Sequence, residues 1–201
     1  MISWIIATHD RGVLRDNLLA SLGDVADDEL IVVEGAPSIA VAYNEGARRA
    51  KRSLRCYIHH DVQILNVPRL RGELAAACGA DVGIVGVVGS RTAWVPWWEG
   101  QPCGSVRDAR LGRLDFGPGG PCAYLDGMLL ATAQLLHWDE TYPGWHLYDH
   151  DICEQMLRRG LSNVCLDDGA EVLLHNTSSP TDVAKLRDWP AGRGRFMEKW
   201  R

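Results

Sequence analysis

The first half of the chain alternates short apolar runs with longer amphipathic segments, and this alternation is the feature that most restricts the fold. The runs at 2–7, 29–33, 55–59 and 81–88 have the length and β-branched composition of buried strands. The segments at 13–22, 39–51 and 67–78 carry leucine or alanine at helical spacing. Because strands and helices in this rhythm form βαβ units, we expect an α/β fold with a mainly parallel central sheet flanked by helices.

The second half lacks this rhythm. Residues 89–121 are rich in Gly, Pro, Trp and Arg and show little periodicity, so we expect a long functional or mobile loop there. The pattern then predicts strands at 121–125, 163–166 and 171–174, a strand passing into a helix at 128–136, and a helix at 151–159 closed by Gly160. A polar, helix-prone tail covers 180–201, and the absence of repeats and linkers favours one domain, 1–201.

Charge, cysteine use and hydropathy argue against several classes of protein. The net charge of -5 disfavours a nucleic-acid partner, because such proteins usually present a basic face. The six cysteines form no CxxC pair, which favours a reducing cytoplasm. The N-terminus lacks the basic region of a signal peptide, and the apolar run 82–88 is far shorter than the ~18 residues of a membrane span. We therefore expect a cytoplasmic protein with no integral membrane segment.

Polar side chains follow the predicted strands. Thr8 to Gly12 follow the first strand, Glu34 the second, His59-His60-Asp61 the third, and His175 a late strand. In open α/β sheets, ligands bind beyond the carboxyl ends of the strands, so these residues outline a pocket.

His59-His60-Asp61 is the most informative of these stretches. On a strand, His59 and Asp61 share one face and His60 points away. An imidazole beside a carboxylate suits a divalent ion such as Mn²⁺, which also accepts phosphate oxygens, and His175 could complete the ligand set. The alternative is that both histidines of the stretch are structural.

Two further segments are candidates for substrate contact. In Tyr148-Asp149-His150-Asp151, an aspartate could cap the following helix or act as a general base towards a hydroxyl group. The aromatic, turn-rich residues 138–145 could form a wall of the acceptor site. Trp97 and Trp98 lie in a loop with prolines, where they could stack on sugar rings in a flap or simply pack on the sheet.

Several nucleotide and hydrolase motifs are absent. The chain has no GxxxxGK[ST], no GxGxxG opening a helix after the first strand, and no GxSxG. These absences argue against P-loop, Rossmann dehydrogenase and α/β-hydrolase chemistry.

The order of the remaining motifs resembles that of GT-A fold glycosyltransferases, especially family-2-like enzymes, over about residues 2–178. The similar segments are 5–11, 31–35, 43–47, 57–62, 125–128, 138–140, 148–152, 158–160 and 174–175. The resemblance implies a nucleotide-binding half at about 1–90, an acceptor and catalytic half at about 91–178, and a helical tail at about 180–201. It implies sugar transfer from a nucleotide-diphosphate sugar, with UDP-sugars favoured, to a glycan, lipid-linked glycan or small-molecule acceptor.

The resemblance also implies a role for each matched residue. The nucleotide-sugar donor would contact Thr8, Asp10, Glu34, Asn44, Gly46 and His60. A divalent metal, Mn²⁺ or Mg²⁺, would be held by His59, Asp61 and His175, with His59 replacing the first aspartate of the family's DxD motif. Asp149 would be the catalytic base of an inverting reaction, and Tyr148 replaces the glutamate that usually precedes it. The substrate-binding set would be Trp97, Trp98, Asp126, Gly127, Tyr148 and Asp151.

Two alternatives remain open at this stage. A sugar nucleotidyltransferase is also an α/β protein with a metal, although the loop after the first strand here is short and has no lysine. A GT-A domain that binds a nucleotide or glycan without turnover would explain the substitutions at His59 and Tyr148.

Overall fold

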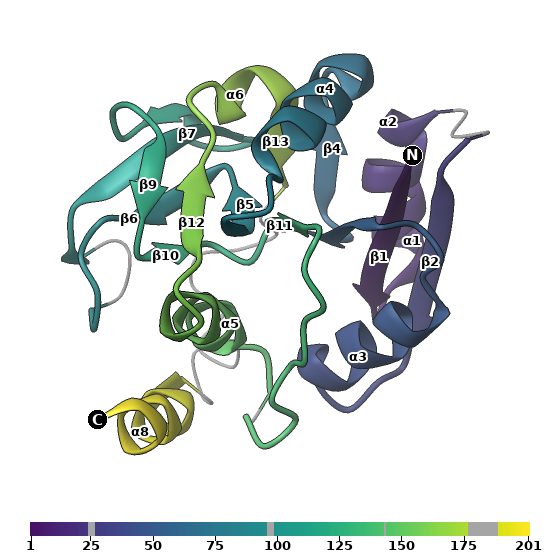
Figure 1. The fold of residues 1–201 in the computed structure, drawn as a ribbon. Coiled ribbons are helices and arrows are strands. Elements are labelled where there is room, and N and C mark those ends of the chain that lie inside the picture. Colours follow the sequence, from purple (N-terminus) through teal and green to yellow (C-terminus); the bar gives the residue numbers. More distant parts are fainter. Residues whose placement is uncertain (24–26, 96–98, 143, 177–188) are drawn as a thin grey trace.

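The computed structural model describes residues 1–23, 27–95, 99–142, 144–176 and 189–201. Within them, a seven-stranded sheet in the order β2-β1-β3-β11-β5-β12-β9 forms the centre (Figure 1). Its strands are β1 Ile2–Thr8, β2 Glu29–Glu34, β3 Leu54–His59, β5 Val82–Gly86, β9 Gly120–Cys122, β11 Leu129–Thr132 and β12 Ser162–Cys165. β1, β2, β3, β5 and β12 run in one direction, and β11 and β9 run in the opposite one. The expectation of a mainly parallel sheet is confirmed.

A second sheet of the described chain has the order β10-β6-β7-β13-β4, with β8 paired to β7. Its strands are β4 Val62–Ile64, β6 Val88–Ser90, β7 Pro102–Asp108, β8 Gly112–Asp115, β10 Tyr124–Leu125 and β13 Leu173–His175. β4 begins two residues after His60, and it pairs with β13 so that His175 lies opposite Val62. This pairing places the end of β13 against the turn that follows β3.

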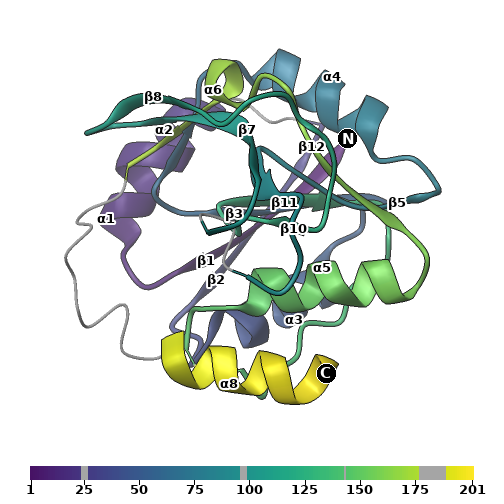
Figure 2. The ribbon, with the colours of Figure 1, turned by 90° about the vertical axis from the view of Figure 1, so that its left-hand side faces the viewer.

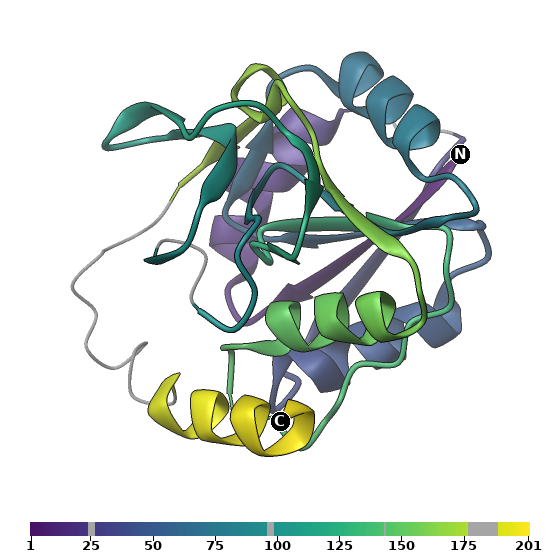
Figure 3. The same cartoon turned by 60° about the vertical axis from the view of Figure 1, so that its left-hand side comes forward.

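Helices cover both faces of the central sheet (Figure 2). One face carries α1 Arg11–Leu14, the π-helical turn η1 Arg15–Leu19, α2 Ala20–Leu22, α4 Val67–Ala77 and the short α6 Gly169–Val172. The other carries α3 Ile39–Arg49, α5 Tyr148–Arg158 and α8 Trp189–Trp200 (Figure 3). No described helix has both the length and the apolar character needed to cross a membrane.

The strand residues divide between two cores as the period of two requires. In β1, Ile5 packs in the core under α3 with Tyr43, whereas Trp4 and Ile6 pack in the core under α1 and α4 with Leu70. This double burial explains why β1 reads as a continuous apolar run rather than as an alternating pattern.

The predicted elements of the first half are confirmed to within a few residues, except that one predicted strand is two separate strands. The run 81–88 contains two strands, β5 and β6, which belong to different sheets. Gly23, with φ 65°, ends α2 as expected, and Gly160, with φ 78°, follows α5 as the predicted cap.

The prediction of a long loop at 89–121 is wrong for its described part, which contains β7, β8 and β9. β7 is buried on both faces, so its sequence does not alternate. Its Gly104 has φ 83°, and a Cβ there would lie 2.3 Å from both Cys165 Sγ and the Val87 carbonyl oxygen. The glycine that suggested a loop is instead required by close contact between strands.

Two shorter predictions in the second half are also wrong. No helix follows β11, because Gln134 bonds back to Thr132 Oγ1 and to the carbonyl of Val82 instead of continuing a helical turn. The strand predicted at 171–174 is divided between α6 and β13. Gly169 at the start of α6 approaches the Ser105 carbonyl so closely that a Cβ would lie 2.1 Å from it.

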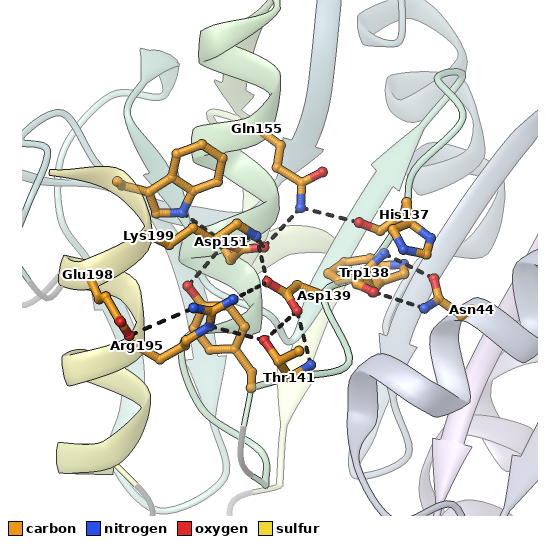
Figure 4. Close-up of polar contacts among 12 residues, drawn as sticks. Asn44, His137, Trp138, Asp139, Thr141, Asp151, Gln155, Arg195, Glu198 and Lys199 are labelled. Atoms are coloured by element: carbon orange, nitrogen blue, oxygen red, sulfur yellow. Dashed lines mark hydrogen bonds and ion pairs between the residues drawn. The ribbon is translucent and has the colours of Figure 1, made fainter.

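The C-terminal helix α8 is attached to α5 and to the segment before it (Figure 4). Lys199 Nζ lies 2.7 Å from Asp139 Oδ2 and 2.8 Å from Asp151 Oδ1. Trp200 Nε1 donates to Asp151 Oδ1 at 2.8 Å. The helical character expected for the tail is thus present at 189–200, and 177–188 lie outside the described residues.

Candidate functional site

Three residues with metal-ligating atoms converge where β3 ends. His59, Asp61 and His175 each offer one such atom, and these atoms lie within 4.8 Å of one another. His59 Nδ1 is 3.9 Å and His175 Nε2 is 3.5 Å from Asp61 Oδ1. The amide of Asn176 donates to the Asp61 carbonyl at 2.8 Å, which fixes the end of β13 to the turn after β3. Two segments more than a hundred residues apart thereby supply one cluster.

The donor atoms of this cluster fit a divalent cation. Asp61 Oδ1 is buried and has no hydrogen-bond partner within the described chain, so a negative oxygen faces the two imidazoles unsatisfied. Burial opposes ionisation of Asp61, but the His175 ring 3.5 Å away and the other nearby histidines hold its pKa well below the usual range. The carboxylate is therefore ionised at neutral pH, as a metal ligand must be.

The two histidines of the cluster respond differently to their surroundings. Burial lowers the pKa of His59, although the charge of Asp61 acts in the opposite direction. Burial also disfavours the charged form of His175, but its close contact with the Asp61 carboxylate outweighs this effect and raises the pKa of His175. A cation binding here would displace a proton from His175 more often than from His59.

Tyr148 completes the surroundings of His59. The Tyr148 hydroxyl lies 2.7 Å from His59 Nε2, which leaves Nδ1 as the ring nitrogen that faces Asp61. Tyr148 is buried, and its ring packs beside Tyr43 and Trp138. Burial raises the pKa of Tyr148 well above its usual value, so the phenol is protonated and can donate. A hydrogen-bond partner on the ring nitrogen that does not face the metal fixes the orientation of a metal-ligating histidine.

Two buried carboxylates beside Tyr148, those of Asp126 and Asp149, interact electrostatically. Asp149 Oδ2 accepts from the Gly127 amide at 3.1 Å, and Asp126 Oδ1 accepts from the Met128 amide at 2.9 Å. Burial and the charge of Asp149 raise the pKa of Asp126. Burial also acts against ionisation of Asp149, but the charge and hydrogen bonds of His150 lower its pKa. A pair of acids with pKa values shifted apart is typical of an acid–base site.

The backbone just before α5 is strained. Leu147 has φ 63° and ψ 2°, a left-handed conformation that is uncommon for residues other than glycine. The turn directs the first residues of α5 towards the end of β3, and such strain is concentrated at functional sites.

The turn after β1 lies next to the cluster through His60. The Thr8 hydroxyl is 2.7 Å from His60 Nδ1, and the rings of His9 and His60 have centroids 4.8 Å apart. Asp10 caps α1, since its Oδ1 accepts from the amides of Gly12 and Val13. The side chains at the end of β3 therefore alternate in direction, as expected. His60 points away from His59 and Asp61, towards the residues that the resemblance assigns to the nucleotide.

Three other residues assigned to the nucleotide have structural partners. Glu34 forms an exposed ion pair with Arg11. The side chain of Asn44 bonds to both the amide and the carbonyl of Trp138, which fixes that segment to α3 (Figure 4). A Cβ at Gly46 would lie 2.3 Å from Ile5 Cγ2, so this glycine allows α3 to pack closely on β1. Whether any of them also contacts a nucleotide stays a prediction.

Of the expected substrate contacts, Asp151 has structural partners instead. The Asp151 carboxylate is only 2% exposed and is bonded to Tyr142, Gln155, Lys199 and Trp200, so it anchors α8 rather than facing Asp149 (Figure 4). Trp97 and Trp98 lie outside the described residues.

The structure adds residues that the sequence did not single out. Trp145 is 39% exposed, and its ring lies 6.0 Å from that of His9, next to the turn after β1. His150 bonds to Asp149. The aromatic stretch 138–145 gave a signal for Trp145, but nothing in the sequence distinguished it from Trp138, which is buried in the core.

The fold is of the GT-A type. The sequence profile of the Glycosyltransferase like family matches residues 22–199, and the chain therefore belongs to this family. A comparison with curated protein sequences found no match.

Several solved structures of GT-A glycosyltransferases have a similar fold. Mannosyltransferase PcManGT from Pyrobaculum calidifontis, in complex with GDP-Man and Mn²⁺, has a TM-score of 0.62 and 13% identity, over 98% of this chain and 61% of that one. TarS 1-349 of S. aureus has a TM-score of 0.59 and 12% identity, over 87% of this chain and 60% of that one. GalNAc-T7 with UDP, GalNAc and Mn²⁺ has a TM-score of 0.56 and 12% identity, over 94% of this chain and 47% of that one. The chain thus spans less than two thirds of each, and the likeness shows the fold.

Proposed function

We propose that this chain transfers a sugar from a nucleotide-diphosphate sugar to an acceptor hydroxyl with inversion, using Asp149 as general base and a divalent cation bound near Asp61. The observation that carries the proposal is the meeting of His59, Asp61 and His175 beside the Asp126–Asp149 pair. The nearness of a candidate metal-ligating cluster to an ionised carboxylate that could act as a base supports the proposal. The family membership supports transfer chemistry, and the two similar structures that hold Mn²⁺ support the choice of cation.

The ligands of the cation would be Asp61, His175 and the Nδ1 atom of His59. The cation, Mn²⁺ or Mg²⁺, would neutralise charge on a leaving diphosphate. Tyr148 holds the His59 ring so that Nδ1 faces Asp61. We infer that the donor diphosphate lies between this cluster and the turn of Thr8 to Asp10, with His60 between them.

Asp149 would remove the proton from the acceptor hydroxyl. Its lowered pKa keeps it ionised at neutral pH, and its hydrogen bond to the Gly127 amide fixes one oxygen. Burial and the charge of Asp149 raise the pKa of Asp126, which favours its protonated form, and a protonated Asp126 would donate a hydrogen bond to a sugar hydroxyl. We expect a glycan, lipid-linked glycan or small-molecule acceptor, and we propose a cytoplasmic location because all six cysteines are free thiols.

A thermal-shift panel with UDP, GDP and CMP, each with and without Mn²⁺, tests the donor site. We expect UDP with Mn²⁺ to raise the melting temperature, since a ligand at 100 times its Kd stabilises the folded state by about 2.7 kcal/mol. Asp61→Asn should remove the part of the shift that depends on Mn²⁺. A stronger shift with GDP would reassign the donor, and no shift with any nucleotide would contradict the proposal.

A second experiment separates turnover from binding. Asp149→Asn should keep the nucleotide shift and abolish release of nucleotide from the donor sugar. If the wild-type chain binds a nucleotide but releases none from its sugar conjugates, the domain is a binding module without turnover. If Asp149→Asn remains active, the assignment of the base is wrong.

A further inference from the structure

The histidine that follows Asp149 is buried beside the candidate base. His150 is 5% exposed, and its ring faces the aromatic core between α5 and α8. The ring centroids of Tyr124 and Phe196 lie 4.8 Å and 6.3 Å from it. A side chain packed in this way cannot contact a substrate directly.

The polar contacts of His150 converge on one carboxylate oxygen. Its amide donates to Asp149 Oδ1 at 2.8 Å, and its ring Nδ1 lies 3.1 Å from the same oxygen. Because an ionised carboxylate only accepts, Nδ1 carries the hydrogen of this bond. The other oxygen, Oδ2, accepts from the Gly127 amide. Donors from α5 and from the turn after β10 therefore fix both oxygens of Asp149.

The arrangement has a cost in stability. His150 Nε2 is buried and has no hydrogen-bond partner in the described chain. Leaving such an atom unpaired and out of contact with water destabilises the folded state. An apolar side chain of similar volume would pack against Tyr124 and Phe196 without this cost. A residue that breaks a packing rule next to a candidate base is expected to serve function rather than stability.

We propose that His150 is a positioning residue that holds the Asp149 carboxylate in the orientation from which it accepts the proton of the acceptor hydroxyl. The inference rests on the proposed transferase function. The Nδ1–H···Oδ1 bond restrains rotation of the carboxylate, and a displacement of about 1 Å in such a group can lower a rate by roughly 100-fold. Within the described part of the chain, the other titratable groups around Asp149 are Asp126, His59, Tyr43, Tyr148 and Cys153, and of the titratable side chains described there His150 is the one bonded to it.

A matched pair of variants tests the proposal. His150→Met removes the donor and fills the space, and His150→Asn keeps an N–H group near the position of Nδ1. With the nucleotide sugar that the wild-type chain turns over, His150→Met should lower kcat about 10- to 100-fold at unchanged donor KM. It should melt at the wild-type temperature or above, and His150→Asn should recover most of kcat. Full activity in His150→Met, or a loss with a lowered Tm and no recovery in His150→Asn, would overturn the proposal.

A measurement without turnover keeps the two proposals distinguishable. Long-range ¹H–¹⁵N NMR of the wild-type chain should show a hydrogen on Nδ1 of His150, and Asp149→Ala should change its chemical shift. If only Nε2 carries a hydrogen, His150 does not hold Asp149, whatever the activity. If Nδ1 carries the hydrogen but no donor sugar is consumed, the proposed transferase function is wrong, while the hydrogen bond from His150 to Asp149 is confirmed.

Discussion

Replacing Gly127 by alanine tests whether the turn after β10 positions both candidate centres. An ideal Cβ at Gly127 lies 2.0 Å from the Tyr148 hydroxyl oxygen and 2.6 Å from its Cζ, much closer than real Cβ atoms approach. Gly127 does not have a positive φ, so alanine introduces no backbone strain and the effect is steric. The substitution must therefore displace either Tyr148 or the turn itself.

The magnitude follows from how firmly Tyr148 is held. The side chain is buried, its ring packs against those of Tyr43 and Trp138, and it cannot swing into solvent. Overpacking a core costs about 1–3 kcal/mol, and loss of the Tyr148–His59 hydrogen bond adds about 1 kcal/mol. We expect Gly127→Ala to lower the free energy of unfolding by about 3 kcal/mol, or roughly 6–12 °C in Tm for a chain of this size.

The assay combines thermal unfolding with Mn²⁺ titration by calorimetry. Because a displaced Tyr148 no longer orients His59, Mn²⁺ affinity should fall at least about 10-fold. Gly72→Ala is the matched control: this glycine lies within α4 with nothing within 4 Å of its Cβ position, so alanine should stabilise the helix by about 0.5–1 kcal/mol. If Gly127→Ala melts and binds Mn²⁺ like the wild-type chain, the contact between the turn and Tyr148 does not organise the site, and the reasoning fails.

Three further predictions address the site and its support. Tyr148→Phe should weaken Mn²⁺ binding by about 10-fold and lower the Tm by roughly 2–4 °C through loss of a bond that contributes about 1 kcal/mol, and an unchanged Kd in calorimetry would show that the hydroxyl does not orient His59. Lys199→Met should lower the free energy of unfolding in urea by about 2 kcal/mol, because it removes charged hydrogen bonds to Asp139 and Asp151; no loss would mean that α8 is not held by this lysine. Asp28 is buried, which alone would raise its pKa, but bonds from Trp4, Ile2 and Arg71 lower it. The ionised Asp28 therefore stabilises the folded state above its unfolded pKa of ~3.9, and this stabilisation is lost as the pH falls through its lower folded pKa. In urea titrations, Asp28→Asn should have a lower free energy of unfolding than the wild-type chain at pH 7. On acidification, the free energy of unfolding of Asp28→Asn should fall by less than that of the wild-type chain.

The sequence predicted those parts of the fold that depend on local pattern. β1, β3 and α3 have their predicted places, because buried strands and amphipathic helices are encoded in short windows. β7 was not predicted, because a glycine such as Gly104 in a Gly- and Pro-rich stretch indicates a loop. Only the fold shows that Gly104 is needed for close contact with Cys165 and Val87. The pairing of β4 with β13 also depends on contacts distant in sequence, and it is this pairing that brings His175 to Asp61.

The same distinction applies to the candidate site. Strand parity was enough to separate His60 from His59 and Asp61, since side-chain direction alternates along any strand. The roles of Asn44 and Asp151 were not accessible in this way. Each has a side chain able to bind a ligand, and only the fold shows that the Trp138 backbone and the α8 side chains already bond to them.

The two positions that depart from the family's motifs are in contact with each other. The resemblance places a carboxylate where His59 stands and another where Tyr148 stands, and in this chain those side chains share a hydrogen bond of 2.7 Å. Two acids at this distance would repel each other unless they shared a proton, whereas an imidazole and a phenol make a neutral bond. The substitutions are therefore compatible as a pair, and each alone would leave a buried polar atom without its partner. The pair retains Nδ1 of His59 as a ligand directed at Asp61, which favours a retained metal site over a degenerate one.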